Sequence, residues 1–217
     1  MPDLHLRAAA WVPDNDPHRP WSDAAEIAAQ WIWQRSEVES VPPLLVTNAR
    51  NARRFGIDAL DAIASAGGHT TPGSRTRPNR APVLVYVPYG PALQLAMELA
   101  RGYSLVAVET IRFPLNEWAA GAAAINLLDG EISPSAMSDE IRGDLDSVIF
   151  YGGRNGWTGP DEKAHARRHL LDHVNTGALS ADQAASYALS QGATDRGAKR
   201  LQQLLEKGSV HRGHGLA

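Results

Sequence analysis

One stretch constrains the fold of this chain more than any other: residues 83–111, VLVYVPYGPALQLAMELARGYSLVAVETI. Residues 83–87 are continuously apolar, which is typical of a strand buried on both faces of a sheet. Pro91 stands where a first helical residue is favoured, and the apolar residues after it recur at helical spacing. Residues 105–108 form a second apolar strand. Because two strands joined by a helix require a crossover connection, the stretch predicts one parallel unit of an α/β sheet.

The flanking sequence continues this alternation of apolar strands and amphipathic helices. Further strands are expected at 4–12, 44–47 and 145–151, and helices at 22–35, 117–127, 161–174, 181–191 and 195–207. The strand at 4–12 is expected at an edge of the sheet, and Asn48 is expected to cap a helix. The pattern predicts a three-layer, Rossmann-like α/β sandwich with a mainly parallel sheet of about four or five strands.

The predicted domain organisation follows from the last expected strand. Residues 1–160 would form the Rossmann-like domain, and residues 161–217 would form a helical C-terminal annex packed on it. The alternative is two separately folded pieces divided near residue 160.

Composition excludes several classes of protein. With 43% hydrophobic residues the chain can bury a core, and without cysteine it has neither disulfides nor thiolate chemistry. No apolar run approaches the length of a membrane span, and the N-terminus lacks a basic region followed by an apolar core. We therefore expect a cytoplasmic protein without a membrane partner.

Ligands of open parallel sheets bind outside the carboxyl ends of the strands. The residues expected there are Arg50, Arg53, Arg54, Tyr89, Gly90, Glu109, Arg112, Gly152, Gly153, Arg154 and Asn155. Guanidinium groups and the backbone amides of glycine turns both bind phosphate oxygens, so we expect an anionic, nucleotide-like small molecule. Glu109 is the candidate for a ligand hydroxyl. The role would be regulatory or accessory, and because G-x-G-x-x-G and G-x-x-x-x-G-K-[ST] are both missing, no cofactor is identified.

Three histidines, His165, His169 and His173, form a stripe on the helix expected at 161–174. The H-E-x-x-H pattern is missing and collinear imidazoles do not converge on one ion, so no metal site is predicted. Since G-x-S-x-G is missing as well, no catalytic residue is assigned, and the sequence leaves open whether the protein is an enzyme.

Segregated charge supports an alternative, a nucleic-acid-binding accessory protein. Residues 50–80 and 163–217 are net basic, whereas 1–49 and 81–162 are net acidic. The contacts would come from Arg75, Arg77 and Arg80 of the loop 69–82, and from Arg196, Lys199 and Arg200 of the last two helices. The spacing of Ala188, Gly192, Thr194, Ala198 and Leu201 is that of a helix-turn-helix. Gly197 counts against it, because glycine weakens a helix, and so does Gln191, which takes a position that is usually apolar. A helical hairpin that only packs on the protein would have the same glycine between its helices.

A third alternative is a subunit of a larger protein assembly. Its protein partner would cover an exposed apolar patch around Trp31, Trp33 or Trp118.

Overall fold

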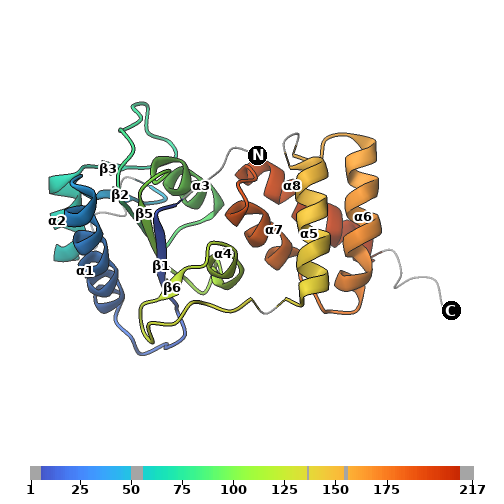
Figure 1. Ribbon diagram of the computed structural model, residues 1–217, viewed down its shortest axis with the longest axis horizontal. Helices are drawn as coiled ribbons and strands as arrows, with labels where there is room; N and C mark the ends of the chain where they lie inside the picture. Colours follow the sequence, from blue (N-terminus) through green and yellow to red (C-terminus); the bar gives the residue numbers. More distant parts are fainter. Residues whose placement is uncertain (1–5, 50–55, 136, 154–155, 211–217) are drawn as a thin grey trace. The chain divides into compact units, whose positions relative to one another are not determined.

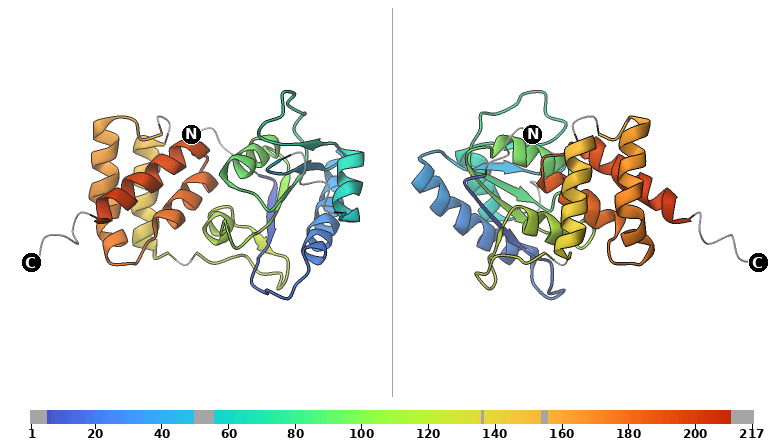
Figure 2. Two further views of the ribbon diagram at one scale, coloured as in Figure 1. Left: turned by 180° about the vertical axis from the view of Figure 1, so that it is seen from behind. Right: turned by 45° about the vertical axis from the view of Figure 1, so that its right-hand side comes forward.

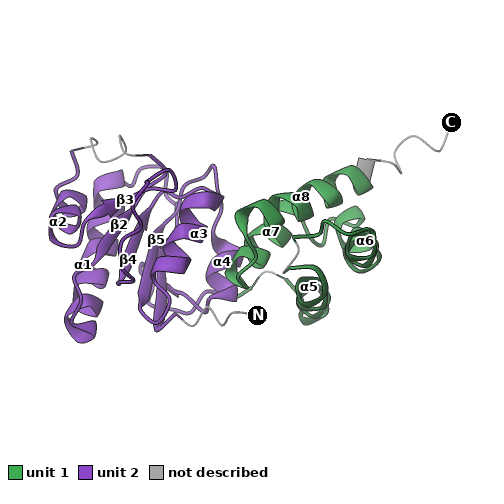
Figure 3. Cartoon of the chain, turned by 90° about the horizontal axis from the view of Figure 1, so that it is seen from above, with its two compact units in different colours: residues 1–3, 134–217 green, residues 4–133 purple. Residues whose placement is uncertain are grey.

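The computed structural model describes residues 6–49, 56–135, 137–153 and 156–210. The chain forms two compact units, shown in Figure 3. Unit 2 spans residues 4–133, and unit 1 comprises residues 134–217 together with residues 1–3. Each unit has its own hydrophobic core. The boundary between the units therefore lies at residues 133 and 134, whereas the sequence placed it near residue 160.

Unit 2 is built around a parallel sheet. Its described strands are β1 (Ala8–Val12), β2 (Leu44–Val46), β3 (His69–Thr70), β4 (Val83–Tyr86), β5 (Ser104–Val108) and β6 (Ile125–Asn126). Their order is β3-β2-β4-β5-β1-β6, and all pairings between these strands are parallel. The sheet thus has 6 described strands, slightly more than expected. All residues of β4 and β5 are buried, as their continuous apolar sequence predicts.

Helices cover both faces of this sheet (Figure 1). On one face lie α1 (Trp21–Glu39) and α2 (Asp58–Ala66), and on the other lie α3 (Gly90–Leu99) and α4 (Asn116–Gly121). Side chains alternate along a strand, so Leu84 and Tyr86 pack in the core under α1 and α2, while Val83 and Val85 are buried on the opposite face. The expected three-layer α/β sandwich is confirmed.

The crossover unit predicted from residues 83–111 is also confirmed. β4 and β5 pair in parallel, with Val83 opposite Leu105, and α3 connects them. Pro91 lies in the first turn of α3, where the missing N–H costs no helical hydrogen bond.

Two expectations for unit 2 are wrong. The first strand is not an edge strand, because β1 pairs with β5 on one side and with β6 on the other. The helix expected at 117–127 ends as α4 at Gly121. Ala123 then takes a left-handed backbone conformation with φ 48°, which ends the helix and lets the chain return to the sheet as β6.

Unit 1 is helical in its described part. Its helices are α5 (Asp139–Gly152), α6 (Pro160–Asn175), α7 (Ala181–Ser190) and α8 (Asp195–Val210). The last three match the helices expected from the sequence. The left view of Figure 2 shows α8 running across α5 and α6. None of the described helices is both long and apolar enough to cross a membrane.

The strand expected at 145–151 is wrong, because this segment belongs to α5. Ser138 caps the helix by accepting a hydrogen bond from the backbone N–H of Ile141 at 3.3 Å. The buried residues Ile141, Leu145, Val148 and Ile149 recur at helical spacing and contribute to the core of unit 1. The apolar run therefore has the period of a helix face.

Candidate functional site

The loops that follow β4 and β5 meet at the carboxyl edge of the unit 2 sheet. Tyr89 contacts Phe113 edge to face, with ring centroids 6.3 Å apart. Of the residues expected at this edge, the structure therefore brings the segments of Tyr89, Gly90, Glu109 and Arg112 together. Arg112 is exposed, and Gly90 begins α3.

Glu109 holds these loops together through its own hydrogen bonds. Its Oε1 accepts from the N–H of Leu115 at 2.6 Å, and its Oε2 accepts from the N–H of Asp14 at 2.7 Å. Burial raises the pKa of Glu109, although these two backbone hydrogen bonds oppose the shift. The hollow beside it, lined by Val12, Arg19 and Trp21 among others, measures only about 20 Å³. Glu109 thus has a structural role at this edge.

Asn48 connects the ends of the neighbouring strands β2 and β4. Its Nδ2 donates to the carbonyl oxygen of Val87 at 2.7 Å, and its Oδ1 accepts from the N–H of Tyr89 at 2.8 Å. The sequence assigned Asn48 to a helix cap, but the structure uses both ends of its amide to join two strand ends.

The remaining residues expected at the edge do not complete a site there. Arg50, Arg53, Arg54, Arg154 and Asn155 lie outside the described residues. Gly152 and Gly153 belong to unit 1 and end a helix rather than follow a strand. Gly152 is required by packing, since a Cβ there would lie 2.5 Å from Nε1 of Trp157. The expected strand-end position of Gly152 and Gly153 is therefore wrong.

The basic loop of unit 2 carries three arginines. Arg75, Arg77 and Arg80 are all exposed. Arg77 lies 4.0 Å from Glu98, the limit for an ion pair.

Unit 1 contains the larger hollow, a groove of about 370 Å³ between α6 and α8. Its charged lining consists of Lys163 and Arg167 from α6 and of Arg200 and Lys207 from α8. We call this the α6–α8 groove. Among the described residues no carboxylate lines it, and none of these 4 cations forms an ion pair.

The groove has an apolar wall. Trp157 and Leu204, both buried, form its apolar part. Gly156 packs against Gly197 of α8, where an added Cβ would lie 3.2 Å from the Gly156 Cα. Arg200 donates from its guanidinium to the carbonyl oxygen of Gly156 at 3.3 Å, which holds the side chain along the groove.

The positions of the cations follow from helical spacing. Lys163 and Arg167 are four residues apart and lie on the same side of α6, while Arg200 and Lys207 are seven residues apart on α8. Two other cations of unit 1 are paired: Arg142 with Asp139 at 2.9 Å, and Lys199 with Asp195 at 3.1 Å. Among the described residues, Arg168 and Arg196 also lack a carboxylate partner, but they do not line the groove, which holds the other 4 such cations.

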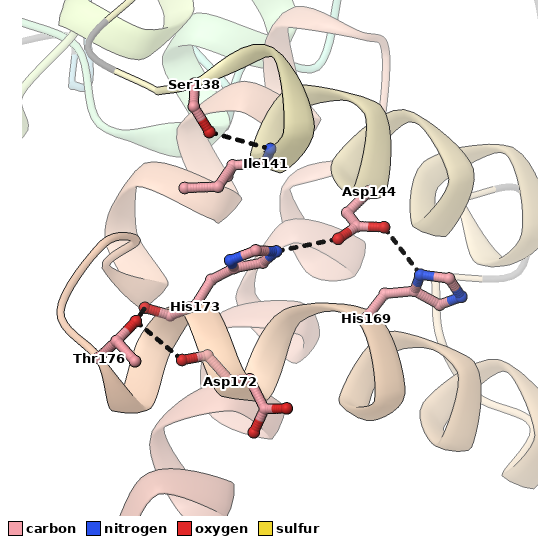
Figure 4. Close-up of polar contacts among 7 residues, drawn as sticks. All are labelled: Ser138, Ile141, Asp144, His169, Asp172, His173 and Thr176. Carbon is pink, nitrogen blue, oxygen red and sulfur yellow. Dashed lines mark hydrogen bonds and ion pairs between the residues drawn. The ribbon is translucent and has the colours of Figure 1, made fainter.

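The histidine stripe lies elsewhere in unit 1, between α5 and α6. Figure 4 shows Asp144 accepting one hydrogen bond from His169 Nδ1 and one from His173 Nε2, both at 2.9 Å. His165 is tilted against His169 and stacks on Tyr151. Within the described residues, no group of three or more acidic or histidine side chains could hold a metal ion.

The Asp144 interactions change its acidity. Burial acts to raise the pKa of Asp144, but the hydrogen bonds from His173 and His169 outweigh this and hold the pKa below its ordinary value. Partial burial, followed by the charges of His169 and Arg168, lowers the pKa of His165. The stripe is thus a structural connection between two helices.

The sequence did not identify the α6–α8 groove. Of its cations, only Arg200 was singled out, as a nucleic-acid contact. The available signal was the i, i+4 spacing of Lys163 and Arg167 within a basic segment, but sequence cannot show that this face meets α8.

The chain matches no protein-family model, no curated protein and no solved structure. The chemistry and geometry of the site are therefore what indicate a function for this chain.

Proposed function

We propose that unit 1 binds phosphate groups, or a ligand that carries them, in the α6–α8 groove. The observation that carries this proposal is the set of 4 cations that surround one hollow without an ion-pair partner among the described residues. Lysine and arginine are the side chains that bind phosphate oxygens most strongly, through charge-assisted hydrogen bonds. At about 370 Å³ the groove also has the volume of a small-ligand site.

Two physical features indicate that the groove binds an anion and is not simply part of the solvent-exposed surface. The cations project from two packed helices, so their spacing is fixed before a ligand arrives. Like charges held close together repel one another, and a bound anion relieves this repulsion and stabilises the folded unit. Trp157, which is buried, contributes an apolar part of the lining.

The carboxyl edge of the unit 2 sheet is the weaker candidate for the same chemistry. Its acidic and amide side chains are already bonded to backbone groups, and its hollow is small. Contacts of Arg50, Arg53 and Arg54 with a nucleotide stay predictions.

A titration of the ¹⁵N-labelled full chain with inorganic pyrophosphate, followed by NMR at fixed ionic strength, tests the proposal. We expect shift changes for the Trp157 indole and for amides of α6 and α8. The double variant Lys163→Ala/Arg167→Ala should weaken binding by about tenfold or more, since each hydrogen bond to a charged group contributes about 1.5–3 kcal/mol.

Arg142→Ala is the matched control. It removes an arginine of unit 1 that does not line the groove and should leave the titration unchanged. Equal binding by the double variant and the wild type, or shift changes confined to unit 2, would contradict the proposal.

A further inference from the structure

The helices α7 and α8 are joined as in a helix-turn-helix. α7 ends at Ser190 and α8 begins at Asp195, and Gly192 in the turn has φ 86°, a left-handed conformation that favours glycine. Ala188 in α7 and Ala198 and Leu201 in α8 are all buried. These are the positions at which a helix-turn-helix packs its two helices against each other.

The outer face of α8 has the composition of a DNA-reading helix. Arg196, Lys199 and Gln203 are exposed and fall within two turns of the helix, and Lys199 would leave its ion pair with Asp195 to reach a base. Arginine, lysine and glutamine are side chains that recognise base edges in the major groove. Thr194, just before α8, accepts a hydrogen bond from the N–H of Gly197 at 3.1 Å and so fixes the start of the helix.

The glycine in α8 has a packing reason. An added Cβ on Gly197 would lie 3.1 Å from the Thr194 hydroxyl and 3.2 Å from the Cα of Gly156. Glycine is therefore needed where the connection between α5 and α6 crosses α8. The sequence-based objection that Gly197 weakens the second helix loses its force, because this contact fixes α8 in place.

Charge on α8 is divided between two sides. Gln202 donates to Asp182 of α7 at 2.8 Å and to Glu206 of α8 at 3.0 Å. Arg200, Gln203 and Lys207 line the α6–α8 groove. Gln203 therefore lies where the base-reading face of α8 meets the phosphate-binding cations.

We infer that the phosphate-bearing ligand of unit 1 is duplex DNA, an inference that rests on the proposed function of the groove. α8 enters the major groove with Arg196, Lys199 and Gln203 toward the bases. The backbone phosphates beside it contact Arg200 and Lys207 on α8 and Lys163 and Arg167 on α6. From Arg196 to Lys207 the helix rises about 16 Å, enough to extend from the floor of a groove about 12 Å wide to its phosphates.

The test uses the full chain and a fluorescein-labelled duplex DNA of about two helical turns, measured by fluorescence anisotropy at several salt concentrations. We expect the logarithm of the binding constant to fall with the logarithm of salt concentration, by about 0.9 for each phosphate contacted. Lys163→Ala/Arg167→Ala should weaken binding and reduce this slope by about 2. Arg142→Ala should leave both affinity and slope unchanged.

Base reading is tested by selecting bound duplexes from a random pool. The wild type should enrich one sequence, and Arg196→Ala/Gln203→Ala should lose about tenfold or more of its affinity for that sequence. Its affinity for unselected duplex should change much less. Absence of any enriched sequence would overturn the assignment of α8 as a reading helix.

Failure of this inference is distinguishable from failure of the proposed function. Pyrophosphate shifts in the groove, combined with no duplex binding tighter than about 10⁻⁴ M at physiological salt, would overturn DNA and leave phosphate binding intact. Stronger binding of single-stranded or double-stranded RNA of equal length would also overturn it. Duplex binding that is insensitive to the groove variant would overturn the inference, whereas the proposed function is contradicted only by the pyrophosphate titration.

Discussion

The two units differ in whether the polar side chains around their hollows already have partners within the protein. At the carboxyl edge of the unit 2 sheet, Glu109, Asp14 and Asn48 are bonded to backbone groups of neighbouring loops. In unit 1, the 4 cations of the α6–α8 groove have no carboxylate partner among the described residues. The carboxyl edge of the sheet, where proteins of this fold class usually bind ligands, has a hollow of about 20 Å³. The α6–α8 groove of unit 1 measures about 370 Å³.

This difference shows that the place where a fold class usually binds ligands need not be the place where side chains are free to bind one. In an open α/β sheet, topology places loops at the carboxyl edge, but it does not decide whether their side chains bind a ligand or one another. Backbone N–H groups that are buried need partners, and Glu109 and Asn48 supply them. Of the cations of the α6–α8 groove, Arg200 donates one hydrogen bond to a backbone carbonyl, and none of the 4 has a carboxylate partner among the described residues, which leaves their charge available to a ligand.

The largest effect should come from removing the wall of the groove. Trp157 is buried in the core of unit 1, so Trp157→Ala should lower the free energy of unfolding of this unit by about 3–5 kcal/mol. Hydrogen exchange followed by mass spectrometry should show faster exchange in α5, α6 and α8. Trp157→Phe keeps an aromatic ring and should cost less. Unchanged exchange in Trp157→Ala would show that the wall is not part of the core and would weaken the contrast between the units.

The sequence predicted the sheet better than the site, for a physical reason. Residues 83–87 and 105–108 are buried on both faces, and this environment appears directly as a continuous apolar run. The run at 145–151 looks similar, yet it becomes part of α5, because Ser138 caps a helix and the buried residues recur at helical spacing. A short apolar run does not distinguish a strand from a helix face. The capping residue Ser138 before this run was the sequence signal for a helix.

The site was harder to predict because it depends on pairing between distant residues. The sequence made Glu109 a candidate contact for a ligand hydroxyl, but its partners Asp14 and Leu115 are defined only by the fold. Lys163 and Lys207 come from helices separated by α7. Charge segregation correctly located basic character in the last quarter of the chain, although it could not show which cations lacked partners.

A smaller loss of stability should follow from removing the Asn48 side chain, which joins the ends of β2 and β4. Asn48→Ala leaves the carbonyl of Val87 and the N–H of Tyr89 without their present partner, and should cost about 1 kcal/mol because both groups are near solvent. Urea unfolding can be followed through the ¹⁹F signal of fluorotryptophan at the buried Trp118 of unit 2. Asn48→Asp keeps the acceptor and loses only the donor, so its stability should lie between Asn48→Ala and the wild type.

The same variant sharpens the comparison of the two sites. Pyrophosphate binding by Asn48→Ala should equal that of the wild type, since Asn48 does not line the α6–α8 groove. A loss of binding in Asn48→Ala would move the phosphate site to the sheet edge.

The smallest effect is a pH response of opposite sign in the two units. The pKa of Asp144 is lowered in the folded protein, so its contribution to the stability of unit 1 is present above the ordinary value of 3.8 and is lost as the pH falls through the lowered pKa. Because the pair is partly exposed, the contribution is about 0.2–1 kcal/mol. The ¹⁹F signal of fluorotryptophan at Trp157 reports unfolding of this unit, and Asp144→Asn should remove the response.

Glu109 should give the stability of unit 2 a pH dependence of the opposite sign. Its pKa is raised, so its contribution to the stability of unit 2 is fully present below the ordinary value of 4.5 and is lost as the pH rises through the raised pKa. Lowering the pH toward 4.5 should therefore stabilise unit 2, as read from the Trp118 signal, whereas unit 1 begins to lose stability only below that pH. Glu109→Gln keeps a carbonyl acceptor and should abolish the change in unit 2. The same pH response in both units would mean that Glu109 is less buried than its backbone contacts indicate, and that the sheet edge is more open to ligands than we conclude.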